Sequence, residues 1–384
     1  MLGFVSMLMD ISSELIHSLL PVFMVSVLGA SMVSVGIIEG VAEASAAFAK
    51  VFSGAISDYF GRRKFFVALG YGLGAITKPV FPLATSLGWV FTARFVDRIG
   101  KGVRGAPRDA LVADIVPPGL RGAAYGLRQA LDSVGAVVGP LLAIAFMAWL
   151  ANDIRAVMWI AVLPAFLSVI LLVTAVREPG QARSRAGLRP PLTLADARRL
   201  PRRYWHVVLL GSVFTLARFS EAFLVLRALD IGLGPGYAPA VMIVMSGVYA
   251  VAAYPAGAAA DRFSRRLLLI MGLAVLIAAD FVLAAAATAA QVLVGAALWG
   301  LHMGLTQGLL SKLVADTAPA DLRGTAFGIF NLFSGVALLL ASVIAGVLWT
   351  VLGVSATFLA GAAFAAVAIL GLLGYRMKPR AATT

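Results

Sequence analysis

The sequence contains the stretch Gly54-Ala-Ile-Ser-Asp-Tyr-Phe-Gly-Arg-Arg63, and a second copy, Gly257-Ala-Ala-Ala-Asp-Arg-Phe-Ser-Arg-Arg266, lies 203 residues further along. A second pair of segments follows, because Val112–Gly122 and Val314–Gly324 both contain Val-Ala-Asp and then Leu-Arg-Gly at the same spacing. Self-similarity at a fixed offset is the signature of duplicated structural units. The chain is therefore predicted to consist of two structurally related halves.

The composition is suited to lipid rather than to water. Hydrophobic residues make up 61% of the 384 residues and charged residues only 13%, with a mean hydropathy of +0.96. A water-soluble chain of this length would need more polar surface to cover its core. Cysteine is absent, which excludes disulfides and thiolate metal sites. The net charge of +13 lies in short loops and not along a basic helix, so no nucleic-acid partner is expected. No cofactor is expected either.

Apolar runs long enough to span a bilayer recur along the whole chain. A spanning helix needs roughly 20 mostly apolar residues, and about twelve such runs are present. The sequence therefore predicts an all-α integral membrane protein. The predicted spans are residues 2–28, 33–57, 64–83, 85–105, 121–150, 156–176, 204–229, 238–259, 266–287, 289–313, 323–350 and 353–375.

The loops between these runs alternate between basic and uncharged. Arginine and lysine gather in the loops at 62–64, 121, 262–266 and 323, whereas loops such as 29–32 and 288–291 carry no charge. The positive-inside rule places the basic loops and both termini in the cytoplasm of a multi-pass protein of the inner (plasma) membrane. A polar stretch rich in proline and arginine predicts a cytoplasmic linker. The predicted domains are a six-helix bundle at 1–176, this linker at 177–203 and a second six-helix bundle at 204–384.

The repeated loops resemble the signature of the major facilitator superfamily, G-x-x-x-D-(R/x)-x-G-R-(R/K), and its acid-x6-Arg pattern; the second copy has Ser264 in place of the late glycine. The resemblance covers almost the whole chain and implies twelve helices in two pseudo-symmetric six-helix bundles, with transport by alternating access. In that fold we expect an acid such as Asp58 to face a helix end of the neighbouring half, and the arginines to bind acids across the bundle and close a cytoplasmic gate. The predicted gate-loop residues are Gly54, Asp58, Gly61, Arg62, Arg63, Asp114, Arg121, Asp261, Arg265, Arg266, Asp316 and Arg323.

A glycine-rich pattern in the span at 121–150 concerns the direction of transport. Gly126, Gly135, Gly139 and Pro140 match the superfamily's antiporter pattern G-x8-G-x3-G-P-x2-G-G, although its last two glycines are absent. The glycines permit close packing of helices and the proline gives a fixed bend. In the family this pattern accompanies exporters, so the resemblance favours export of the bacterial proton-coupled efflux type.

Ionisable residues inside the predicted spans are concentrated in the first half. Charged groups at bilayer depth each cost roughly a few kcal/mol, so they are functional candidates. Equivalent positions of the second half are nearly neutral; Arg98, for example, corresponds to Gly300. A weaker part of the repeat pairs Glu14 with Glu221, which makes Glu221 the candidate of the second half. The predicted proton-coupling and cavity residues are Asp10, Glu14, Glu39, Glu43, Arg94, Asp97 and Glu221.

Two mechanisms remain open for these acids. At least one of them could bind a proton in competition with the substrate, and a conformational change near Arg94 would then release it. Alternatively, the acids could be permanently paired with Lys50, Arg94 and Lys101 in buried structural networks. Arg94 falls where the superfamily places a helix-4 arginine linked to proton coupling.

The leading functional interpretation is a secondary active transporter that exports a small organic solute in exchange for protons. A proton-coupled importer, a divalent-metal exporter and a non-transporting membrane receptor of the same fold are the alternatives. Asp10, Glu14 and His17 share a helix face, but one histidine with two acids is a weak metal signature, so no metal site is predicted. No nucleophile, phosphate loop or metal triad points to an enzyme. The predicted partners are the small-molecule substrate, protons and the lipid bilayer, with the chain acting as a monomer.

Overall fold

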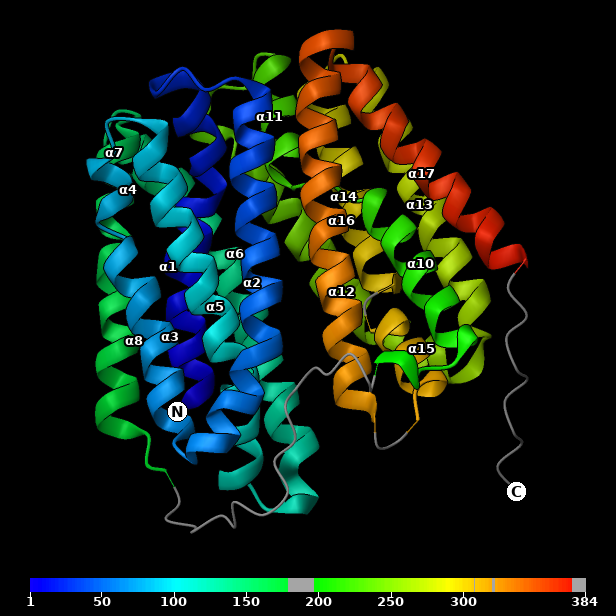
Figure 1. Ribbon diagram of the computed structural model, residues 1–384. Helices are drawn as coiled ribbons and strands as arrows, with labels where there is room; N and C mark the ends of the chain where they lie inside the picture. The colour runs from blue at the N-terminus through cyan, green and yellow to red at the C-terminus, as the bar shows by residue number, and fades with distance from the viewer. Residues whose placement is uncertain (179–196, 307, 320–321, 375–384) are drawn as a thin grey trace.

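The computed structural model describes residues 1–178, 197–306, 308–319 and 322–374, and within these ranges it leaves out the side chains of residues 55, 58, 118 and 260–262. The described residues form helices and connecting turns, without strands. Two groups of helices stand side by side (Figure 1). The first group consists of α1 Leu2–Val22 with a π-helical turn Phe23–Val27, α2 Met32–Phe60, α3 Arg63–Thr77, α4 Val80–Leu83, α5 Leu87–Ile115, α6 Arg121–Trp149, α7 Ile154–Ile160 and α8 Val162–Ala175. The second group consists of α10 Arg202–Leu216, α11 Ala222–Asp230, α12 Ala240–Arg262, α13 Arg265–Ala285, α14 Ala289–Thr306, α15 Leu309–Thr317, α16 Arg323–Leu352 and α17 Val354–Gly374.

Ten helical segments among the described residues are long and apolar enough to cross a membrane. The other two predicted spans are helical but differ in character. α5 has 29 residues, and its charged side chains lower its hydropathy. The span predicted at 204–229 is interrupted, because α10 ends at Leu216 and α11 begins only at Ala222. The predicted linker lies largely outside the described residues.

Large apolar side chains point outward over much of the molecule. Leu163 on α8 is 73% exposed and Val251 on α12 is 77% exposed, and many other leucines, isoleucines and phenylalanines behave in the same way. In water such a surface would be an aggregation hazard, whereas lipid tails solvate it without cost. The outward-facing side chains are therefore those of a multi-pass membrane protein.

The loops that carry the repeated signatures all lie at one end of the bundle, which we call the basic end. They join α2 to α3, α5 to α6, α12 to α13 and α15 to α16 (Figure 1). Gly61 ends α2 in the left-handed conformation, at φ +63°, which permits the sharp turn into α3. The loops around Gly29–Ser31 and the C-terminal ends of α6 and α16 lie at the opposite end.

The two groups meet mainly along α2 and α16, with further contacts of α6 with α12 and of α1 with α11. Glycines allow the two backbones to touch. A Cβ atom added to Gly36 would lie 2.2 Å from the carbonyl oxygen of Ser342, and one added to Gly346 would lie 2.5 Å from that of Met32. The backbones of α2 and α16 therefore approach each other most closely in the part of the interface nearer to the opposite end, and the two halves are joined there.

Candidate functional site: a charged cavity between the two halves

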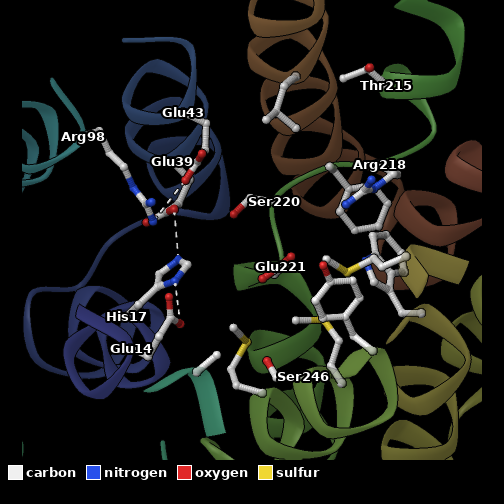
Figure 2. A pocket seen from close by; sticks show the side chains of 18 of the residues that line it. Glu14, His17, Glu39, Glu43, Arg98, Thr215, Arg218, Ser220, Glu221 and Ser246 are labelled. Atoms are coloured by element: carbon white, nitrogen blue, oxygen red, sulfur yellow. Dashed lines mark ion pairs between the residues drawn. The ribbon is translucent and has the colours of Figure 1, made fainter. Parts of the chain in front are cut away.

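A cavity of about 460 Å³ lies between the two groups of helices and is lined by both (Figure 2). Ligand sites in proteins commonly have volumes of this order. Its walls are unusually rich in charge for the interior of a membrane protein. The charged residues and the histidine among its lining are Glu14, His17, Glu39, Glu43, Arg98, Lys101, Arg218 and Glu221.

A second cavity of about 600 Å³ continues from the first toward the basic end. The two share lining residues such as Glu14, Glu43 and Lys101, so they form one connected space. The second cavity reaches Lys50 on α2 and Asp109 near the end of α5. At the opposite end, the packing of α2 against α16 lies between the cavity and the surface of the molecule.

Glu39 is the centre of an ion-pair network in the first half. Arg94 on α5 donates two hydrogen bonds to it, from Nε to Oε1 at 3.1 Å and from Nη2 to Oε2 at 2.7 Å. Both side chains are almost completely buried. A two-pronged guanidinium–carboxylate pair is the strongest common ion-pair geometry and fixes both groups. Arg94 therefore holds Glu39 rigidly in the cavity wall.

His17 extends this network to the cavity surface. Its Nε2 lies 3.6 Å from Glu39 and its Nδ1 lies 3.5 Å from Glu14, so the imidazole bridges two carboxylates (Figure 2). On the other side, Arg98 lies 3.1 Å from Glu43. The side chains of Glu14 and Glu43 are 20% and 30% exposed, respectively, so they are the most accessible members of the network from the cavity.

A second buried pair lies deeper in the first half. Lys78, just after α3, binds Asp97 on α5 at 2.8 Å and the hydroxyl of Ser13 at 3.0 Å. Asp97 was predicted to belong to the cavity, but it is buried and does not line it. Sequence analysis missed Lys78, since a lysine at the end of an apolar run resembles an ordinary interfacial residue. In the structure, Lys78 is buried and its ammonium group binds Asp97.

The glycines of the predicted antiporter pattern position two of the acids. A Cβ atom on Gly135 would lie 2.9 Å from Cβ of Asp10, and one on Gly139 would lie 2.9 Å from Cβ of Glu14. α6 therefore packs against α1 directly behind these two acids, and Asp10 lines the second cavity. Close packing was expected for all three glycines; at Gly126, however, nothing lies within 4 Å. Pro140 lies inside α6.

The second half contributes an irregular segment, residues 217–221, between α10 and α11. Ser220 is held there by a hydrogen bond from its backbone N–H to Oγ of Ser342 on α16. Arg218 and Glu221 both line the cavity. Among the described residues neither side chain has an ion pair or hydrogen bond, although Glu221 is close enough to interact electrostatically with His17. Glu14 and Glu221, which the repeat paired, thus face the same space (Figure 2).

The gate-loop arginines form equivalent ion pairs in the two halves. Arg63 binds Asp114 at 2.5 Å, and Arg265 binds Asp316, each acid lying 51 residues after its arginine. The motif alignment placed Arg62 opposite Arg265, but the contacts align Arg63 with Arg265, since each is the first residue of its helix. Both pairs lie within one half. These two ion pairs therefore do not link the halves in the conformation described, and a cytoplasmic gate formed by the arginines stays a prediction.

Among the remaining gate-loop residues whose side chains are described, none has a contact with the other half. Arg62, Arg121 and Arg323 are exposed, as is Gly61, and Gly54 packs beside Ala106 of α5. Arg266 donates a hydrogen bond to the carbonyl oxygen of Leu373 on α17. The side chains of Asp58 and Asp261 lie outside the described residues.

The cavity has no cluster suited to a metal ion. Among the residues that the structure describes, no group of three or more histidine, aspartate or glutamate side chains is placed to hold one. His17, Glu14 and Glu39 lie near one another, but Arg94 and His17 already occupy the carboxylate oxygens.

Comparisons with known proteins agree on one family. The family model described as Major Facilitator Superfamily matches residues 2–246 and 209–384. An uncharacterised MFS-type transporter of Methanocaldococcus jannaschii is 32% identical over 381 residues, which cover 97% of this chain and 93% of that protein. An uncharacterised protein of Mycobacterium tuberculosis is 27% identical over 340 residues, covering 87% and 82% of the two chains. The crystal structure of a point mutant of the nucleoside transporter NupG has a TM-score of 0.78 at 14% identity and covers 97% of this chain and 98% of its own.

Proposed function

The chain belongs to the Major Facilitator Superfamily and is a multi-pass membrane transporter, and we propose that it exports a small organic solute in exchange for protons. In this proposal the two halves rock about the central cavity so that it opens alternately to the two sides of the membrane. The basic end lies in the cytoplasm together with both termini. The connected cavity, which extends toward the basic end, then represents an inward-facing state.

The observation that supports proton coupling is the network around Glu39. It joins Glu14, His17 and Glu39 through contacts of 3.5 and 3.6 Å, and its members face the solute cavity. A histidine between two carboxylates can accept and return a proton with little movement of heavy atoms. The charged groups that face it are Glu14 on its own helix, Glu39 and Glu43 on α2, Arg94, Arg98 and Lys101 on α5, and Arg218 and Glu221 on segment 217–221.

The direction of transport is supported by α6. Gly135 and Gly139 belong to the pattern that accompanies exporters in the superfamily, and in this protein they pack α6 against the helix that carries Asp10 and Glu14. A pattern that determines how closely α6 approaches α1 also determines where these acids stand. Export and proton coupling would therefore depend on the same contact.

The proposal is tested in proteoliposomes that contain the purified full chain. Uptake of candidate solutes is measured with and without an imposed pH gradient, and Glu14→Gln and Glu43→Gln are compared with the unsubstituted protein. We expect accumulation driven by the gradient, and we expect it to be lost in Glu14→Gln while exchange of solute for solute persists. Transport that ignores both the pH gradient and the membrane potential would refute proton coupling. Unaltered gradient dependence in both variants would refute the assignment to this network.

A matched control uses Asp153→Asn, since Asp153 lies at the opposite end and caps α7 outside the cavity. It removes a carboxylate of the same half without touching the network. Gradient-driven transport should survive in this variant, and a loss there as large as in Glu14→Gln would mean that the assay responds to any missing acid.

A further inference from the structure

The two charged residues of segment 217–221 differ from the acids of the Glu39 network. Every acid of that network has a basic partner, whereas Arg218 and Glu221, like Lys101, line the cavity without an ion pair or hydrogen bond among the described residues. Both side chains are partly buried, so each charge loses part of its hydration, and that cost is relieved when a ligand supplies the opposite charge. A cation and an anion, both unpaired and three residues apart in the sequence, therefore favour a ligand that carries both signs.

The irregular segment keeps these two side chains from forming an ion pair, although their charges lie close enough to interact. In a continuous helix, residues three apart can approach each other and pair. Between α10 and α11 the chain is not helical, and the bond from Ser220 to Ser342 holds it against α16. Interrupted helices at the middle of the membrane are a common way for transporters to present binding groups. The equivalent helix of the first half, α1, continues through Glu14, so the interruption belongs to the second half alone.

The wall beside these charges is apolar and deep. The Phe219 and Trp299 rings lie 5.3 Å apart between their centroids, and three methionines complete the surface. Methionine and aromatic side chains adapt to apolar groups of several shapes. The apolar residues of this wall are Phe219, Met242, Met245, Trp299 and Met303.

We propose that the solute is a zwitterion with an apolar side group, such as an amino acid or a derivative of one, with its carboxylate on Arg218 and its ammonium on Glu221. This inference rests on the proposed function for transport, although the binding site itself does not depend on it. A cation without a carboxylate would leave Arg218 unpaired, and an anion without an amine would leave Glu221 unpaired. A site with buried polar groups discriminates strongly against ligands that leave one of them unsatisfied.

The position of Glu221 also provides a route to proton exchange. Glu221 lies close enough to His17 and Glu14 for their charges to interact. An ammonium group bound to Glu221 therefore places a positive charge next to the histidine and disfavours a proton there. Solute and proton would compete across the interface between the halves, as exchange requires.

The test is binding to the purified full chain, measured by thermal stabilisation and by isothermal calorimetry. The probes are phenylalanine, leucine and tryptophan, each beside its decarboxylated amine and its deaminated acid: phenethylamine and 3-phenylpropionate, isoamylamine and 4-methylpentanoate, and tryptamine and 3-indolepropionate. We expect at least one zwitterion to bind about tenfold more tightly than both of its matched relatives. If no zwitterion of the panel does so, the proposal is wrong.

Two variants separate the charge roles from a structural role. In Arg218→Gln the zwitterion should bind no better than its amine, and in Glu221→Gln no better than its acid. Lys312→Gln on α15 is the control, since Lys312 does not line the cavity, and it should retain the full preference. Equal losses for all three members of a set would show that the substitution damages the fold and would contradict the proposed contacts. If the zwitterion binds but nothing is transported, the proposed function is refuted while the binding site stands. If a solute is transported in exchange for protons but no zwitterion binds more tightly than its amine and its acid, the site is wrong while the proposed function stands.

Discussion

The contact between α2 and α16 makes a direct prediction about which conformation the protein prefers. Gly36→Ala places a methyl group 2.2 Å from the carbonyl oxygen of Ser342, whereas ordinary van der Waals contact begins near 3.4 Å. The obstacle is backbone and not a flexible side chain, so the two helices must separate by about 1 Å at this point. Gly346→Ala does the same from α16, with its methyl group 2.5 Å from the carbonyl oxygen of Met32.

The magnitude follows from the cost of overpacking. Inserting a methyl group into a closely packed interface costs roughly 1–3 kcal/mol. This cost applies only while the halves are joined at the opposite end, and it disappears when they separate there. The ratio of the two states should therefore change by roughly 5- to 150-fold toward the state that is closed at the basic end.

Because the chain contains no cysteine, spin labels can be attached at cysteines introduced at chosen positions. Gly122→Cys and Gly324→Cys provide two labelling sites at repeat-equivalent positions of the basic end, both exposed and with nothing within 4 Å of an added side chain. Distances between spin labels at these sites are measured by pulsed electron paramagnetic resonance. Adding Gly36→Ala should increase the population of short distances, whereas Gly72→Ala, at an open position of α3, should not.

Two results would refute this reasoning. The first is a distance distribution that is the same with and without Gly36→Ala in a folded protein, which would mean that the contact is absent or that it yields at no cost. The second is an equal shift with Gly72→Ala, which would attribute the effect to the greater helix propensity of alanine and not to contact with Ser342.

Three further predictions concern buried groups and are read from thermal unfolding of the purified protein, with transport measured beside it. Lys78→Met should destabilise the fold by roughly 3–5 kcal/mol because it leaves Asp97 unpaired, and adding Asp97→Leu should recover most of that loss; a double variant no better than the single one would contradict it. Asp280→Asn should change stability by less than about 1 kcal/mol, because both oxygens of this fully buried carboxyl group lack a partner and the group must be uncharged; a large loss would show an ionised, stabilising carboxylate. Gly139→Ala should cost roughly 1–3 kcal/mol and impair transport by displacing α1, whereas Gly126→Ala should be tolerated, and equal effects would show that the close packing is unimportant.

The sequence predicted the helical architecture well because hydrophobic length is a local property. Runs of about twenty apolar residues can be counted without knowing what they contact, and the structure places helices in each of them. The duplication was equally accessible, and it brought Glu14 and Glu221 to the same cavity. The run at 85–105 was counted in the same way, and α5 covers it even though its charged side chains lower its hydropathy.

The interruption at residues 217–221 could not be predicted. The segment reads Ala-Arg-Phe-Ser-Glu, without the proline or glycine that usually marks a break in a helix. Its conformation depends on a contact with Ser342, more than a hundred residues away, and on the cavity that solvates its charges. Tertiary contacts of this kind have no local signature.

Partners of buried charges were also beyond the sequence. The first half has several acids and several bases, and spacing alone allows many pairings between neighbouring helices. Arg94 was expected near the acids, yet only the structure shows that its close partner is Glu39, at 2.7 Å, whereas Glu43 lies nearer to Arg98 than to Arg94. The sequence therefore could not show that Asp97 is paired with Lys78, away from the two cavities.

The distribution of these pairs constrains how coupling can work. Contacts within one half are carried along unchanged when the halves rock, whereas contacts across the interface change. The pairs Glu39–Arg94 and Lys78–Asp97 lie wholly within the first half, so opening and closing cannot by itself break them. A mechanism that releases a proton by separating Arg94 from Glu39 is therefore disfavoured. Under the proposed exchange, we expect the distance of Glu221 from His17 and the access of water to Glu14 to change instead. The solute on the second half would then govern the proton on the first through these groups.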